Sequence, residues 1–541
     1  LSIGRLMDIR LGEGLVVPES IDKFETWEAS GGYGSSGYFG WNRISKHMAA
    51  YYMTGEESHA REALRLAFPD QAAKDEIART DGEMIENKDD PLAGPYHYNA
   101  HMMILYWDLI EDSPVFTDEE RLQVANAFSR QLNHRKDEGV YGLTGPAPYI
   151  SSRHGQWSAI SLYCLGRYFA KSYPGPIWDQ CVRGGVNAFG SLHEHAWVTG
   201  ESDNLFWYPT GMAPIFTYLV LTGDRVPMRN GVIAGILRGQ EILSSGRTPD
   251  WALRYAALDY LNKAAYLTGD GRWVAYRNRT GLDTSIFRLG QSFWPEDSPK
   301  PALPEDLVGK WSLHNLPLPA VGGRGTGFLP SESVYFGSFR SAADASGDYA
   351  LIDAYDGASR NPYHTFTILA LRLDGVTLLE GYLNQLRIRA DGLTEKTIAM
   401  NAALRHHRVL GQTAIAVGEV PDMPYTDWRR TLVHREGRYS VIIDELTPRT
   451  DTRNLEVQLL WETKGGNWTA DPQRPNQMRL DRAIEASTPR IPVVCTASDV
   501  DILRDGPQAT MQWFGPARAG VKQYFVSLVT GIPAESSPEV A

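Results

Sequence analysis

Apolar residues recur three and four positions apart through the first part of the chain, the spacing of amphipathic helices. Thr117 followed by Glu120 forms a capping box, which marks a helix start. The pattern predicts helices over residues 44–53, 57–68, 99–110, 117–135, 158–171, 178–195, 212–222, 232–243 and 252–268. Because repeated helical hairpins often close into a ring, we expect an incomplete α/α toroid.

Short alternating apolar runs take over after about residue 331. They predict strands at 333–340, 349–355, 365–373, 377–383, 413–417, 428–434, 439–445, 455–463, 477–486, 492–496, 510–514 and 523–529. Hairpin turns are expected at 373–376 and 434–438, the first around Asp-Gly. Many short strands with few helices indicate an antiparallel β-sandwich.

Proline and glycine are dense between these regions, and both residues interrupt helices and strands. We therefore expect an α+β multidomain chain, with an α/α toroid at 1–295, a linker at 296–330 and an antiparallel β-sandwich at 331–541. A chain of 541 residues is too long for one ordinary core, which agrees with this division.

The formal net charge is −12 and no long run of Lys or Arg is present, which argues against a nucleic-acid partner. An acidic protein can still bind an anionic polymer through a locally basic cleft. No apolar run reaches the length of a membrane span, and no signal-like segment is visible. Cys164, Cys181 and Cys495 show no disulfide or zinc pattern, although the first two could face each other across adjacent helices.

Two segments gather the residue types that cleave acidic sugar chains. SSRHGQW at 151–157 places Arg153 beside His154, and ESDNLFWYP at 201–209 contains Tyr208. Cleavage by β-elimination needs a group that neutralises the uronate carboxylate, a base for the C5 proton and an acid for the leaving oxygen. A guanidinium suits the first role, an imidazole the second, and a phenol the third or both proton transfers. Tyr141 and Tyr149 compete with Tyr208 for its role.

Other side chains are candidates for holding sugar. Aromatic rings can cover the apolar faces of sugars, although such rings more often fill cores. The candidate substrate-binding residues are Tyr96, His97, Asn99, Trp157, Asn204, Trp207 and Arg360. His97 and His101 stand four residues apart, and His193 and His195 also look metal-like, but neither pair has a clear third ligand. The metal content is therefore unknown from the sequence.

These motifs and the expected architecture resemble the heparinase II/III-like superfamily of polysaccharide lyases. NPYHTFTILALRLDGVTLLEG resembles its β-domain signature through His364, Gly375 and Glu380, and YTDWRRTLVHREGRYSVIIDEL resembles its Trp-Arg…Asp hairpin. The resemblance implies that His364 joins the catalytic set of Arg153, His154 and Tyr208. Many relatives carry Asn where this chain has Arg153, and several carry a His-x-His-x-Asp series that is incomplete here. No cofactor is expected, and a structural divalent metal has no clear ligand set.

The resemblance implies a polysaccharide lyase that acts on a 4-linked uronic-acid glycan in the periplasm or outside the cell. The expected partner is an anionic polysaccharide, and the oligomeric state is not readable. Three alternatives stay open. A toroid glycoside hydrolase would use two carboxylates, for which Glu201, Asp203 and Asp259 are available. A uronyl C5-epimerase would share the proton abstraction, and a glycan-binding protein would keep only the cleft.

Overall fold

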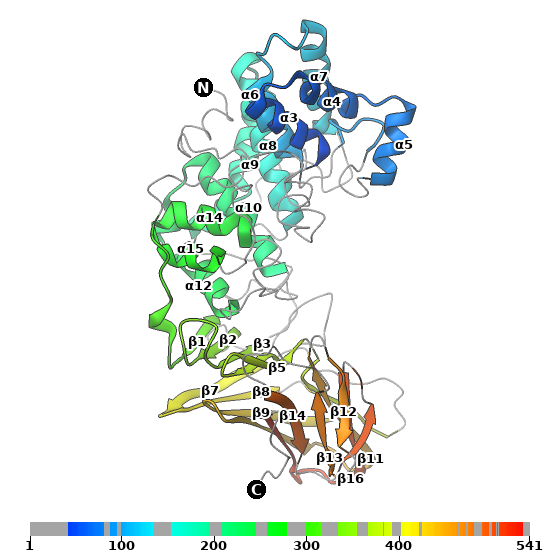
Figure 1. The fold of residues 1–541 in the computed structure, drawn as a ribbon, viewed down its shortest axis with the longest axis vertical. Helices are drawn as coiled ribbons and strands as arrows, with labels where there is room; N and C mark the ends of the chain where they lie inside the picture. Colours follow the sequence, from blue (N-terminus) through cyan, green and yellow to red (C-terminus); the bar gives the residue numbers. More distant parts are fainter. Residues whose placement is uncertain are drawn as a thin grey trace. The chain divides into compact units, whose positions relative to one another are not determined.

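The structure is a computed structural model in which the chain forms a helix-rich unit and a strand-rich unit (Figure 1). The helical unit comprises residues 1–201, 205–236 and 248–302, and the strand-rich unit comprises residues 202–204, 237–247 and 303–541. The structure describes residues 42–80, 87–94, 99–133, 153–194, 207–244, 257–278, 299–315, 334–353, 366–381, 383–391, 402–420, 423, 425–463, 466–471, 474–480, 490–496, 500–504, 506 and 508–533.

A row of neighbouring helices forms the centre of the helical unit. In this row α3 contacts α6, α6 contacts α8, α8 contacts α10 and α10 contacts α14, while α4, α9 and α15 each pack on one row member. The bounds are α3 Arg43–Thr54, α4 Glu57–Ala67, α5 Gln71–Thr80, α6 Ala100–Ile110, α7 Asp118–Arg130, α8 Arg153–Ser172, α9 Pro176–Asn187, α10 Trp207–Thr222, α11 Val226–Arg229, α12 Val232–Leu243, α14 Ala257–Thr268 and α15 Gly271–Asn278, with 3₁₀ turns η3 Gln131–Asn133, η5 Gly190–Glu194 and η7 Glu305–Leu307.

Burial explains why these helices form the inner row. Nearly every residue of α6 is buried, and so is the run from Met212 to Val220 in α10. A helix that is apolar on all sides must be surrounded by protein, whereas α4 keeps a polar outer face. Helical hairpins with a buried inner row and amphipathic outer partners are the expected arrangement of an incomplete α/α toroid.

Two helix starts differ from the prediction. The sequence predicted starts at residues 158 and 212, but α8 begins at Arg153 and α10 begins at Trp207. Gly155 and Pro209 disfavour helix interiors, yet both stand in a first turn, where backbone N–H groups have no intrahelical partner. The predicted helix 178–195 is divided into α9 and η5. Helices α5, α11 and α15 were not predicted.

The strand-rich unit contains three antiparallel sheets. Their strand orders are β1-β2-β3-β4-β5, β12-β13-β14-β17-β10-β9-β8-β7 and β15-β16-β11-β6. The bounds are β1 Trp311–Asn315, β2 Val334–Arg340, β3 Tyr349–Asp353, β4 Thr367–Leu373, β5 Val376–Glu380, β6 Leu386–Arg389, β7 Ala403–Leu410, β8 Thr413–Val420, β9 Thr426–Arg435, β10 Tyr439–Pro448, β11 Thr452–Glu462, β12 Trp468–Asp471, β13 Arg474–Leu480, β14 Arg490–Thr496, β15 Asp501–Arg504, β16 Gln508–Ala517 and β17 Gln523–Pro533. One hydrophobic core joins residues of all three sheets, and the predicted fold class is confirmed.

The predicted linker at 296–330 is only partly a linker. It contains β1, which pairs with β2 at the edge of the five-stranded sheet, and the boundary between the units lies at Ala302 and Leu303. Prolines flank β1 and hid its short apolar pattern. The strands β6, β7, β12 and β15 were also not predicted.

The buried carboxylate of Asp348 links three turns of the strand-rich unit through hydrogen bonds. Asp348 accepts hydrogen bonds from the backbone N–H groups of Asp374 and Gly437, at 2.7 Å each, and pairs with His434 at 3.0 Å. Asp374 and Gly375 have φ values of 46° and 73°, which confirms the predicted Asp-Gly hairpin. Burial raises the pKa of Asp348, but these hydrogen bonds outweigh it and hold the pKa below its usual range.

Candidate active site

The predicted site residues whose backbone is described cluster at helix starts. Arg153 and His154 are the first two residues of α8, and Trp207 and Tyr208 are the first two residues of α10. Asn99 is the N-cap of α6. Because α8 contacts both α6 and α10, three neighbouring inner helices each begin with a predicted site residue.

Several predicted side chains lie outside what the structure describes. This holds for the side chains of Arg153, His154, Trp207 and Tyr208, and for the whole of Tyr96, His97, Asn204, Arg360 and His364. The carboxylates considered for a hydrolase, Glu201, Asp203 and Asp259, have no described side chain either. Their roles stay predictions.

Helices α6 and α8 run parallel, with their N-terminal ends together. At that end the rings of His101 and Trp157 stack, with centroids 4.8 Å apart. At the other end Trp107 Nε1 donates to the Tyr168 hydroxyl at 3.2 Å, and Lys171 pairs with Asp108 at 3.1 Å. Arg153 and His154 therefore enter α8 at the same end at which Asn99 caps α6.

Helix α3 follows the same direction. Asn42, its N-cap, donates from Nδ2 to Met103 Sδ near the start of α6, at 3.4 Å. Tyr51, near the end of α3, hydrogen-bonds Ser113 just after α6. The positive ends of three helix dipoles thus gather at one end of the inner row, which favours a negatively charged ligand there.

Polar side chains are buried where α6 and α8 begin. Asn99, His101 and Gln156 are each no more than 1% exposed. Within the described part of the chain, neither His101 Nδ1 nor Gln156 Oε1 has a hydrogen-bond partner. Leaving such atoms unmet costs free energy, so their presence points to a ligand or water that completes them.

Trp157 does not fit its predicted role. The side chain is 0% exposed and its ring packs on His101, so it offers no free face to a sugar. A flat aromatic ring beside an imidazole fills the core at this helix start. The structure therefore corrects the prediction for Trp157 and assigns it to packing.

A buried lysine, which the sequence analysis missed, belongs to the same row of helices. Lys263 of α14 is 2% exposed and its Nζ donates to Thr217 Oγ1 of α10 at 3.0 Å. Burial, aided by the charge of Lys263, lowers the pKa of His101 to about 3. His101 is therefore neutral at working pH, and its uncharged ring has one nitrogen that donates and one that accepts a hydrogen bond.

The opposite ends of α6 and α8 are closed by satisfied polar groups. Lys171 binds both Asp108 and Glu111, and the Tyr168 hydroxyl donates to Glu111 at 2.7 Å. These contacts hold the two helices in register. Among the described side chains of α6 and α8, the buried polar atoms without a partner therefore lie near the N-terminal ends of the two helices.

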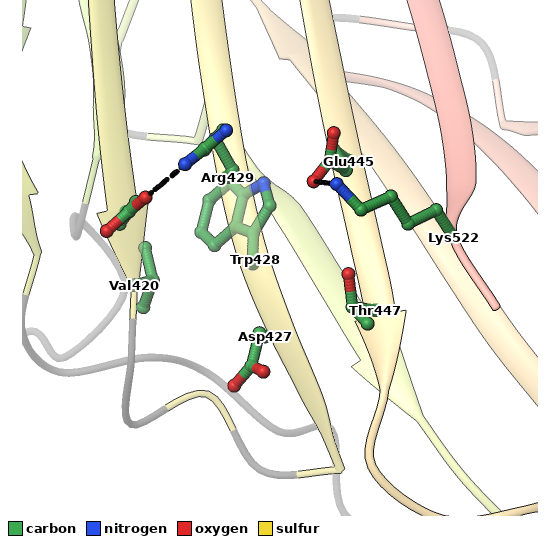
Figure 2. Close-up of a pocket in the computed structure, with 8 residues that line it drawn as sticks. Val420, Asp427, Trp428, Arg429, Glu445, Thr447 and Lys522 are labelled. Carbon is green, nitrogen blue, oxygen red and sulfur yellow. Dashed lines mark hydrogen bonds and ion pairs between the residues drawn. The ribbon is translucent and has the colours of Figure 1, made fainter. Parts of the chain in front are cut away.

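A shallow groove of about 270 Å³ opens on the eight-stranded sheet and is shown in Figure 2. Its charged side chains bind one another, since Arg429 pairs with Glu419 and Lys522 pairs with Glu445 at 2.8 Å. Asp427 pairs with Arg449 at the groove's edge. Because these charges are already matched, the groove lacks the unmet polar atoms found at the helix starts.

Metal and disulfide chemistry find no support among the described residues. No three His, Cys, Asp or Glu side chains of that part of the chain are placed to hold a metal ion. His193 instead pairs with Asp224. Cys164 and Cys181 are buried free thiols, and burial raises the pKa of both above the usual thiol value.

No helix in the described ranges is long and apolar enough to cross a membrane.

No family model matches the chain, and no curated protein does. Solved structures do match it. A mutant heparan sulfate lyase from Pedobacter heparinus is 14% identical, with a TM-score of 0.56 over 98% of this chain and 86% of that one. Heparinase III is 11% identical, with a TM-score of 0.56 over 91% of this chain and 76% of that one.

A third match is the chondroitin AC lyase of Streptomyces coelicolor A3 in complex with chondroitin sulphate. It is 11% identical and has a TM-score of 0.53 over 99% of this chain and 82% of that one. At such low sequence identities, the likeness shows a shared architecture and assigns no role to individual residues. The helical row, the three antiparallel sheets and these matches together show that the chain has the fold of the heparinase-type polysaccharide lyases.

Proposed function

We propose that the protein is a polysaccharide lyase that cleaves a 4-linked uronic-acid-containing glycan by β-elimination. The observation that carries the proposal is that α6 and α8 both bury polar atoms without partners near their starts, and that α8 begins with Arg153 and His154. The similar structures include lyases of heparan sulfate and chondroitin, which fits this chemistry.

The proposed reaction assigns one task to each group. Arg153 binds the uronate carboxylate, and its charge offsets the negative charge that spreads there when the C5 proton leaves. His154 or Tyr208 takes that proton, the electron pair forms the C4–C5 double bond, and the C4–O bond breaks. Tyr208 or His154 then protonates the departing oxygen. His364 stays assigned to the same reaction by the sequence alone.

The structure adds two supporting features to this scheme. The gathered N-terminal ends of α3, α6 and α8 favour the substrate's carboxylate. The neutral His101 and Gln156 are themselves buried, and their unmatched Nδ1 and Oε1 suit hydrogen bonding to substrate through a bound water. No metal is needed in any step. We further propose that the enzyme works in the periplasm or outside the cell, where anionic polysaccharides occur.

The test is a panel of uronate polymers followed by three readouts. A rise in ultraviolet absorbance from the unsaturated sugar, with one new reducing end per event, is the expected result. New reducing ends without absorbance would replace the proposal with a hydrolase. Deuterium uptake from solvent without cleavage would replace it with an epimerase. Binding without any of these changes would leave a glycan-binding protein.

A further inference from the structure

The eight-stranded sheet carries aliphatic side chains on the face that points away from the core. Buried and more exposed residues alternate along β8, β9 and β10, so each strand has an inward and an outward side. The inward side chains are buried, and one of them, Arg430, binds Asp444 and donates to the Phe366 carbonyl just before β4. The outward side of an antiparallel sheet is ordinarily polar where water covers it. Apolar side chains gathered there therefore indicate an interaction surface.

Strand register arranges the outward side chains of β8, β9, β10 and β17 in rows across the sheet. We call two adjacent rows the outer patch: Val417, Thr431, Ile443 and Val526 form one row, and Ile415, Val433, Val441 and Leu528 form the other. All of them are half-buried, and all but Thr431 are aliphatic. Cross-strand neighbours already screen a side chain in the middle of a sheet, so this degree of exposure shows that the outer patch is open to solvent.

A row of charges borders the outer patch at one end of the strands. In the next row the outward residues are Glu419 on β8, Arg429 on β9 and Glu445 on β10, and Lys522 follows just before β17. The signs of these charges alternate across the sheet. Neighbours pair within the chain, Arg429 with Glu419 and Lys522 with Glu445, as Figure 2 shows.

The outer patch and its charged row are complementary to a second copy of themselves. Two sheets that pack face to face keep their strand directions within about 30° of each other. A two-fold axis that runs parallel to the strands, between β9 and β10, reverses the order of the charges in the second copy. Arg429 then faces the partner's Glu445, and Glu419 faces the partner's Lys522. The same operation places each aliphatic row on its own counterpart.

The size of this face suits a dimer of moderate affinity. Four strands about 4.8 Å apart and four rows about 6.8 Å apart span about 500 Å² on one copy. Two such faces bury about 1,000 Å², the lower limit of a specific interface, which corresponds to a Kd in the micromolar range. A sugar chain would favour aromatic faces instead, and none of the outer patch residues is aromatic.

We propose that the protein forms a two-fold symmetric dimer through the outer patch of its eight-stranded sheet. The aliphatic rows of the two copies form the centre of the interface, and the alternating charges form its rim and fix the register. The inference does not depend on the lyase function, because no residue of the proposed catalytic set belongs to this face.

The test is sedimentation equilibrium of the full chain at concentrations from about 0.1 to 100 µM, which bracket a micromolar Kd. Wild type is expected to change from the mass of one chain to the mass of two. Ile443→Lys should raise the Kd by at least about 100-fold, because each copy would bury an ammonium group without a counterion. Ile177→Lys is the matched control, since it makes the same change at a 41% exposed position on α9, and it should leave the Kd unchanged.

A charge exchange tests the register and does not place a charge in the centre of the sheet. Arg429→Glu sets like charges against each other across the two-fold axis and should raise the Kd at least about tenfold. Adding Glu445→Arg should restore the Kd to within about threefold of wild type. Within one chain the double exchange puts like charges side by side, at positions 419 and 429 and at 445 and 522. Only contacts between two copies therefore explain a recovery.

A single-chain mass at every concentration would overturn the proposal. So would a dimer that both Ile443→Lys and Arg429→Glu leave intact, or a charge exchange without recovery. If Ile443→Lys does not fold, the charge exchange decides alone.

Cys495 reports which molecule covers the face. It is half-buried and lies beside Leu528, on the neighbouring strand β14. In the dimer its reaction with a thiol reagent should slow as protein concentration rises, while Cys164 and Cys181 stay buried. A monomeric wild type in which a uronate polymer slows this reaction would assign the face to a glycan and overturn the proposal.

Discussion

Two regions of this protein bury polar side chains almost completely, and they differ in whether the polar atoms are matched. Around Arg430, every guanidinium nitrogen has an acceptor, and Trp428 Nε1 also donates to Asp444 at 2.8 Å. At the start of α6 and α8, His101 Nδ1 and Gln156 Oε1 have no partner in the described part of the chain.

We use this difference to assign different roles to the two regions. A satisfied buried network rigidifies and orients what it holds, and the Arg430 network holds the start of β4. Unmatched buried atoms reduce stability, and a bound water or ligand is one way to satisfy them. The strand-rich network therefore acts as a support, and at the helix starts we propose that a substrate completes the hydrogen bonds through a bound water.

The largest expected effect comes from breaking the satisfied network. Asp444→Asn leaves the Arg430 charge buried without a counterion, which should cost about 3–5 kcal/mol of unfolding free energy. Urea unfolding of the whole protein, followed in the strand-rich unit, measures this loss of free energy. A loss below about 1 kcal/mol would show that Arg430 does not depend on Asp444 and would remove the support role.

The next effect is a pH dependence of the helical unit. The pKa of His101 is about 3 in the folded state against 6.5 as its ordinary value, so only the unfolded chain gains this proton as pH falls. The contribution of neutral His101 to the free energy of unfolding is fully present above about pH 6.5, and it falls by a few kcal/mol toward pH 3. His101→Phe should flatten this slope. Part of the pH dependence should remain in this variant, because burial also lowers the pKa of His47, to about 4.

An unchanged pH slope in His101→Phe would contradict the burial of a neutral imidazole at the start of α6. The substitution keeps an aromatic ring on Trp157, so packing changes little. Thermal unfolding from pH 3 to pH 7 provides the comparison with wild type. The measurement needs no substrate and therefore stands apart from the proposed activity.

Gln156→Met tests the unmatched atoms directly. Removing an unsatisfied acceptor while keeping the side chain's length should leave stability unchanged or raise it by up to about 1 kcal/mol. If a sugar hydroxyl is linked to Gln156 Oε1 through a bound water, KM should rise about tenfold, equivalent to about 1.4 kcal/mol. Lost stability with an unchanged KM would mean that the amide is a structural group.

Asp427→Asn should have the smallest effect and is the matched control for Asp444→Asn. Asp427 lies at the edge of the groove in Figure 2 and pairs with Arg449, and its side chain is 60% exposed. Exposed pairs contribute less than about 1 kcal/mol. A loss as large as that of Asp444→Asn would show that burial does not explain the contrast.

Local signals in the sequence predicted much of the fold. Residues 232–243 form α12 with the predicted bounds, and the Thr117 capping box starts α7. Both signals depend only on residues that are close together in the sequence. The edge strand β7 was missed because its outward residues are polar, as edge strands require, so the apolar alternation fades.

The candidate site was only partly predictable. Residues 153 and 154 were selected for their chemistry, but Gly155 concealed that α8 starts with them. Lys263 was not predicted because its buried hydrogen bond is to Thr217 on another helix, a contact that no local sequence pattern indicates. The role predicted for Trp157 was wrong because an aromatic ring in a motif looks the same whether it faces a sugar or the core.

The central claim is that the starts of the inner helices carry out β-elimination, and the turnover of Tyr208→Phe tests it most directly. The change removes one hydroxyl group from the second residue of α10. With a uronate polymer that wild type converts to unsaturated product, the account predicts a fall in kcat of at least about 100-fold in a variant that unfolds at the wild-type temperature. A folded Tyr208→Phe enzyme with near-normal kcat would contradict it.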